Sequence, residues 1–497
     1  ITVIGNTDMT AIHPADDNGV DLGSSSYEFK NLYVDGVAYL DGLDLNGTTV
    51  SATAGEINIL DGITATTAEL NIMDGVTATA AELNLLDGLT SLSSGATNVN
   101  GLSDGLVENN SIYIGNDPSS STSTAEYNVA FGTTALDAVT AGDKNIAVGY
   151  SALTENTTGS ENTANGYNAM ASNTTGAYNT AIGMSVLMDN TTADFNTGLG
   201  YNALTNNTTG ARNTSIGAAT LMYNTTGSYN IAIGMNGMGS NTTGSRNLAI
   251  GYGALDGPDT ENDNLAIGYD ALGGSIAGGE YNVAIGNYSL DANTTGDNNV
   301  AIGHDALTSN TTGYRNLAIG TNSLKNNTTG NTNMSIGKDA LNTNTTGNYN
   351  LAYGFEAVRD NITGFGNSGF GHGALRFNTI GSNNTGLGTY ALDFNTSGSQ
   401  NTAIGYFTYY RNVTGDKNTA IGNGAGGNVT GGDKNIFIGA WSNTASIGSV
   451  ENSIVIGADA VSHGDNIAVI GNSDMTAIHP ADDNGVDLGS SSYSYKD

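Results

Sequence analysis

One repeat of 17 residues runs through most of this chain and constrains its fold more than any other feature. A clear copy is NVAIGHDALTSNTTGYR, residues 299–315, and the next copy is NLAIGTNSLKNNTTGNT. The spacing is 17 throughout, except for one interval of 18. A period this strict over about 340 residues indicates a repeat architecture, in which each unit packs against its neighbours. An Asn begins each of the twenty copies, at positions 128, 145, 162, 179, 196, 213, 230, 247, 264, 282, 299, 316, 333, 350, 367, 384, 401, 418, 435 and 452.

Numbered from its Asn, the repeat reads N-x-A-I-G-x-x-A-L-x-x-N-T-T-G-x-x. Positions 2 and 4 are mostly aliphatic or Thr, so on a strand they share one face, and position 3 is small, so the opposite face is also tightly packed. Gly at position 5 ends the strand, and Asn-Thr-Thr-Gly at positions 12–15 is typical of a turn. Two glycines per repeat, with frequent Thr and Asn, exclude a helix of useful length.

The repeat therefore predicts an all-β chain, a β-solenoid or β-roll of about twenty 17-residue coils, each with two short strands and two turns. Coils stacked at the strand spacing of ~4.8 Å would give a rod of roughly 95 Å. We expect the Asn at position 1 to form a hydrogen-bonded amide ladder along the rod. Because one coil supplies few large apolar side chains, we expect the small position-3 face to be buried against sister chains in a homotrimer.

Composition excludes several functional classes. The net charge is −34, with only 13 Lys and Arg among 497 residues, which argues against nucleic-acid binding because phosphate contacts need cations. The chain has no Cys, so it contains neither a disulfide framework nor thiolate metal sites. No apolar run approaches 18 residues, so we expect no membrane insertion.

The remaining sequence divides into distinct segments. Residues 1–50 form a first module, 51–98 contain three copies of a 13-residue repeat, 99–127 are transitional, and the solenoid is expected over 128–465. Residues 466–497 repeat the start of the chain almost letter for letter, so we expect the native polypeptide to continue in at least one direction.

The 13-residue repeats are expected to be short helices. Each copy opens with Thr-x-x-Glu, the spacing of a capping box, and closes with Asp-Gly, a helix C-terminal signal. The three capping boxes are Thr53 with Glu56, Thr66 with Glu69, and Thr79 with Glu82.

Two resemblances suggest a function. The segment DLGSSSYEFKNLYVDG, residues 21–36, and the TAAELNLLDG strings resemble modules of bacteriophage tail-fibre shafts, although Glu28 stands where that pattern has a basic residue. The NxAIGxxAL core resembles head repeats of YadA-type trimeric autotransporter adhesins. These resemblances imply a structural fibre or shaft, extracellular and tail-fibre-like, that presents or carries host-attachment surfaces and belongs to a virion.

The alternative is a bacterial surface adhesin or extracellular matrix fibril of tandem repeats, with sugars on its Asn-Thr-Thr sites. In either case the expected partners are further copies of the chain, as a trimer or filament, and a host cell-surface glycan or protein. The variable positions 6–7 and 16–17 are where binding specificity could lie.

Candidate sites for chemistry are few. The five His residues are scattered, and no Ser-His-Asp or paired-carboxylate pattern emerges, so we expect neither an enzyme nor a cofactor. The acidic loop with Asp256, Asp259, Glu261 and Asp263 has ligand types that suit Ca²⁺, although a solvated loop is the simpler interpretation. Ten Asn-Thr-Thr sites fit the glycosylation signature, or are simply good turns: Asn156, Asn173, Asn190, Asn207, Asn224, Asn241, Asn293, Asn310, Asn327 and Asn344.

Overall fold

The computed structural model describes residues 105–476 with short gaps at 116–117, 119–120, 258–259 and 275–278, and fragments at 35, 37, 43–45, 48–50, 489–490 and 493–494. The chain separates into two units, residues 1–96 and 97–497. In the first unit, β1 (Leu43–Leu45) pairs antiparallel with β2 (Thr48–Val50). The predicted short helices at 51–98 lie outside the described residues.

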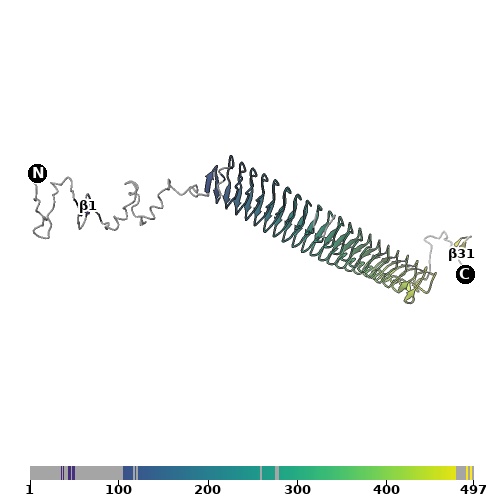
Figure 1. The fold of residues 1–497 in the computed structure, drawn as a ribbon. Coiled ribbons are helices and arrows are strands. Elements are labelled where there is room, and N and C mark those ends of the chain that lie inside the picture. The colour runs from purple at the N-terminus through teal and green to yellow at the C-terminus, as the bar shows by residue number, and fades with distance from the viewer. Residues whose placement is uncertain are drawn as a thin grey trace, which may run out of the picture. The chain divides into compact units, whose positions relative to one another are not determined.

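The second unit is a parallel β-solenoid of about 21 turns of about 17 residues, which confirms the predicted all-β class (Figure 1). It begins with β3 (Gly105–Glu108), which pairs antiparallel with β4 (Ser111–Ile114). From β4 onward the main ladder is parallel and runs strand by strand to β29 (Ala468–Ile470). Coils therefore extend on both sides of the range 128–465 expected from the sequence.

Each coil contributes one three-residue strand, at repeat positions 2–4. These strands are β5 (Val129–Phe131), β6 (Ile146–Val148), β7 (Thr163–Asn165), β8 (Thr180–Ile182), β9 (Thr197–Leu199), β10 (Thr214–Ile216), β11 (Ile231–Ile233), β12 (Leu248–Ile250), β13 (Leu265–Ile267), β14 (Val283–Ile285), β15 (Val300–Ile302), β16 (Leu317–Ile319), β17 (Met334–Ile336), β18 (Leu351–Tyr353), β19 (Ser368–Phe370), β20 (Thr385–Leu387), β21 (Thr402–Ile404), β22 (Thr419–Ile421), β24 (Ile436–Ile438) and β27 (Ile454–Ile456).

Smaller pairs form near the C-terminal end of the second unit. Outside the main ladder, β23 (Val429–Gly431) pairs with β26 (Gly448–Ser449), and β25 (Asn443–Thr444) pairs with β28 (Val461–Ser462). The fragments β30 (Gly489–Ser490) and β31 (Tyr493–Ser494) form an antiparallel pair.

The register places each repeat position above the same position of the previous coil. Val300 lies opposite Leu317, Ala301 opposite Ala318, and so on along the ladder. The last predicted copy is an exception, because Ser453 and not Asn452 occupies position 1, and its backbone N–H donates to Asn435 Oδ1 at 3.0 Å.

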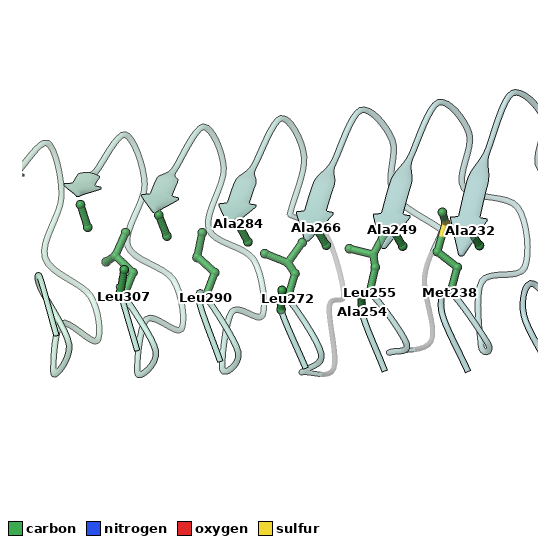
Figure 2. Packing of buried hydrophobic residues seen from close by; sticks show 14 of the residues in the cluster. Ala232, Met238, Ala249, Ala254, Leu255, Ala266, Leu272, Ala284, Leu290 and Leu307 are labelled. Carbon is green, nitrogen blue, oxygen red and sulfur yellow. The ribbon is translucent and has the colours of Figure 1, made fainter. Parts of the chain in front are cut away.

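The interior of most coils is lined by small strand residues and by the Ala-Leu pair. Ala301 at position 3 and Leu307 at position 9 are both fully buried within a single chain. Figure 2 shows the alanines of successive strands facing a column of Leu and Met side chains. The expectation that position 3 faces sister chains is therefore wrong: position 3 points into its own coil, and positions 2 and 4 point outward.

The second apolar run is not a strand, contrary to the sequence-based prediction. Its backbone turns sharply, with φ of +57° at Asp305 and +53° at Leu307, and the same positive values recur at positions 7 and 9 along the solenoid. Such values are rare for residues other than Gly and cost energy locally. They bend the chain so that Leu307 points inward, where its burial offsets that cost.

Two buried amide ladders stabilise the stack, and the one predicted at position 1 is confirmed. Asn128 Oδ1 accepts the backbone N–H of Asn145 at 2.8 Å, and this pattern continues coil by coil to Asn435. The second ladder, at position 12, joins side chains directly, as where Asn310 Nδ2 donates to Asn293 Oδ1 at 2.9 Å. Both ladders also donate to the carbonyl at position 15, which ties them together.

Candidate functional surfaces

The outward side chains of positions 2 and 4 form what we call the strand face. Phe131 is 58% exposed and Tyr353 55% exposed, and the isoleucines between them, such as Ile302, are partly exposed. At ~4.8 Å per coil and ~7 Å between positions 2 and 4, this face is a strip roughly 7 Å wide and 95 Å long. Soluble monomers seldom expose a mostly apolar strip of this extent.

Aromatic columns flank the strand face at positions 6 and 17. Tyr150 stacks on Tyr167 with ring centroids 5.4 Å apart, and Tyr178 stacks on Phe195 at 4.9 Å. Arg212 continues the second column, with its guanidinium 5.2 Å from the Phe195 ring centroid. Rings of neighbouring coils thus stack face to face, with their edges exposed to solvent. This stacking stabilises the contact between coils.

A network of charged and aromatic residues lies between residues 355 and 410, largely at positions 7, 10 and 11 of successive coils. Arg376 forms a bidentate salt bridge with Asp393, with both N–O distances at 2.9 Å. It also forms a longer salt bridge with Glu356, at 3.4 Å. The same guanidinium lies over Phe377 and Tyr390, at 4.4 and 5.3 Å from their ring centroids. Burial raises the pKa of Asp393, and the charge and hydrogen bonds of Arg376 offset part of this effect.

The ten Asn-Thr-Thr glycosylation candidates are the side chains of the position-12 ladder. Asn156, Asn173, Asn190, Asn207, Asn224, Asn241, Asn293, Asn310, Asn327 and Asn344 are all fully buried. Their Nδ2 groups, the atoms to which a sugar would be attached, donate within the rod, as Asn310 does to Gly313 O at 2.9 Å. This burial argues against glycosylation of the folded chain and assigns the motif to structure.

The acidic loop does not assemble a metal site among its described residues. Asp263 is held by Arg246, whose Nε donates to Asp263 Oδ1 at 2.7 Å, and this contact lowers the pKa of Asp263. Glu261 accepts from Thr260 Oγ1 at 2.7 Å, and Asp259 lies outside the described residues. In the parts of the chain that the structure describes, no three His or acidic residues are grouped as a metal would need.

Asp256 belongs instead to a group of carboxylates on neighbouring coils. Burial raises its pKa, and the charges of Asp270 and Asp291 raise it further. The pKa of Asp291 is raised by burial and by Asp270 and Asp305. Carboxylates at positions 7 and 10 of successive coils thus come together through the stacking, which their spacing in the sequence did not suggest.

The described histidines are scattered, as their spacing predicts. His304 and His372 occupy the exposed position 6, and His13 and His479 lie outside the described residues. His463 lines a half-open polar hollow of about 300 Å³ near the end of the solenoid, beside Ser446, Ser449, Ser462 and Asp465.

Comparison with known proteins leaves the chain without an assigned family. No protein-family model matches it, and the search of curated proteins found no match. Within the described ranges, no helix has the length and apolarity needed to cross a bilayer. The strand face, the flanking aromatic columns and the Arg376 network are therefore the features from which a function can be argued.

Proposed function

We propose that this chain is a shaft segment of an extracellular, tail-fibre-like fibre, in which three copies associate through their strand faces. One observation carries the proposal: the side chains of positions 2 and 4, most of them large and apolar, point away from the core of their own coil. Water contact over such a strip is unfavourable, and a second and third copy with the same strip would remove it.

The rest of the molecule is consistent with a mechanical role. Parallel strands, two amide ladders and stacked side-chain columns all link each coil to the next, so stiffness and resistance to proteases follow from the repeat itself. In this role the fibre holds host-attachment surfaces away from the particle, or carries them on its outer columns. The proposal gives the chain no catalytic role and no cofactor.

The test is the mass of the full chain in solution by light scattering, with electron micrographs of the same sample. Three chains of 50.5 kDa in a straight rod are the expected result. We expect Ile302→Asp to weaken the assembly, because it places a charge in the middle of the strand face. The matched control is Thr312→Asp, at an exposed turn position of the same coil, which should leave the mass unchanged.

A mass of one chain would contradict the trimer. Filaments of no fixed length would instead favour the alternative, an extracellular fibril or adhesin of tandem repeats.

A further inference from the structure

The strand face repeats itself so closely that apolar contact alone cannot align two copies of the chain. From Ile216 to Ile336, position 4 is Ile in every coil, and from Ile231 to Leu351 position 2 is aliphatic in every coil. Sliding one copy along another by one coil places like residues on like residues over this stretch. Within the strand face, the alignment must therefore come from residues that break the repeat.

One coil breaks the apolar pattern completely. In β7, both outward residues are polar, Thr163 at position 2 and Asn165 at position 4, which no other described coil shows. The Asn165 side chain is exposed and makes no hydrogen bond within the described part of the chain. The repeat Asn side chains at positions 1 and 12 differ, because they are buried and bonded into the two ladders.

We propose that Asn165 sets the alignment of the associating copies, an inference that rests on the proposed association through strand faces. An amide carries both donors and acceptors, so identical amides at one level can bond to each other. With a shift of one coil, Asn165 would instead face the position-4 residues Val148 or Ile182. Each amide that is buried without a partner should lower the population of the shifted arrangement, relative to the aligned one, by about five- to more than a hundredfold.

The aromatic residues of the strand face select alignment less strongly. Phe131 and Tyr353 also interrupt the Ile column, but a shifted neighbour would still offer their rings an apolar surface. A single polar residue in an otherwise apolar interface is a general device for choosing one register at some cost in stability.

Disulfide trapping can measure the alignment, because the native chain has no Cys. Two differently tagged full-length chains are produced together, one with Ile302→Cys and the other with either Ile302→Cys or Ile319→Cys. Aligned copies should crosslink efficiently through thiols at 302 and 302, and poorly through thiols at 302 and 319. The native mass of each assembly is measured in parallel.

The decisive variant moves the amide by one coil. A chain with Asn165→Ile and Ile182→Asn is paired with a chain that keeps Asn165, so their amides meet only if the chains shift by one coil. Between such chains we expect the 302–319 crosslink, with residue 319 on the altered chain, to replace 302–302 as the dominant product. The ratio of the two crosslink yields should change at least fivefold. Asn165→Ile alone should give a mixture of both crosslinks, and Ile182→Val is the matched control that should leave the wild-type pattern unchanged.

Two failures are distinguishable. If the assemblies keep the mass of three chains and the 302–302 crosslink still dominates in the mixed sample, Asn165 does not set the alignment, although the association stands. If the mass is that of one chain, the association itself is wrong, and the inference falls with it.

Discussion

Replacement of Asn310 by Ala tests whether the buried amide ladder holds the coils together. The Asn310 side chain is fully buried and makes three hydrogen bonds. Its Nδ2 donates to Asn293 Oδ1 and to Gly313 O, both at 2.9 Å, and its Oδ1 accepts from Asn327 Nδ2, also at 2.9 Å. The substitution therefore removes one rung and affects the coils on both sides.

The magnitude follows from the partners that remain. Gly313 O keeps the hydrogen bond from Asn299 Nδ2 at 2.8 Å, so it stays satisfied. Asn293 Oδ1 loses the bond that it accepts, and Asn327 Nδ2 keeps only its donation to Gly330 O at 2.9 Å. Two buried polar groups lose a partner, and at about 1–3 kcal/mol each the local free energy of unfolding should fall by roughly 2–6 kcal/mol.

A long repeat array need not unfold in one cooperative step, so a local measurement is preferable to a single melting temperature. Amide hydrogen exchange resolved to the coils between 282 and 333 is suitable, and a loss of ~2 kcal/mol predicts exchange faster by roughly thirtyfold there. The control is Thr312→Ala in the same turn, where an exposed side chain should contribute no more than about 0.5 kcal/mol. Equal exchange rates in the two variants would refute a stabilising role for the ladder.

Three further predictions concern the backbone, the charges and the core. Gly303→Ala should destabilise its coil, because φ is +136° there and the new Cβ would lie 2.7 Å from the carbonyl of Gly320. Limited proteolysis near residue 303 is the readout. An unchanged cleavage rate would contradict the steric argument. Burial raises the pKa of Asp291 above its unfolded value, so its contribution to stability is present at low pH and lost as pH rises through the folded pKa. Asp291→Asn should therefore raise the thermal stability at pH 7 and reduce the pH dependence of that stability. A lower thermal stability at pH 7 would contradict this prediction. A Cβ at position 369 would lie 2.6 Å from Val358 Cγ2, so Gly369→Ala should destabilise its coil. In a double-mutant cycle, Val358→Ala should relieve part of that loss, with a coupling energy of about 0.5–3 kcal/mol. Strict additivity of the two substitutions would count against direct contact.

The period predicted the coil, the strand at positions 2–4 and the ladder at position 1, but not which side of the strand faces inward. Alternation separates two faces without saying which one is buried. The large residues at positions 2 and 4 suggested the core, yet a 17-residue coil is narrow. In a typical coil the small Ala301 lies inside with Leu307, and the larger residues of positions 2 and 4 are turned outward.

The inward turn of position 9 could not have been predicted from residue types. Leu307 adopts φ of +53°, a conformation that Leu disfavours, and Val358 at +51° is a still stronger exception because it is β-branched. Local propensity is overridden here because burial and stacking against the next coil determine the backbone. The same stacking pairs Asp263 of the acidic loop with Arg246 one coil away, a contact that the residue types of the loop did not reveal.

Buried Asn side chains and the outward Asn165 differ in what they contribute to the solenoid. Asn310 sits at a position that most coils occupy with a buried Asn, so its amide pairs with the identical groups of the two neighbouring coils. Its identity therefore carries little information about where along the rod it lies. Asn165 sits at an outward position, where its side chain belongs to neither amide ladder, and in our proposal it marks one level of the rod. Interior positions are constrained to repeat by the stacking itself. We therefore expect the outward residues that do not repeat to encode the alignment of this chain with its partners and its choice of surface.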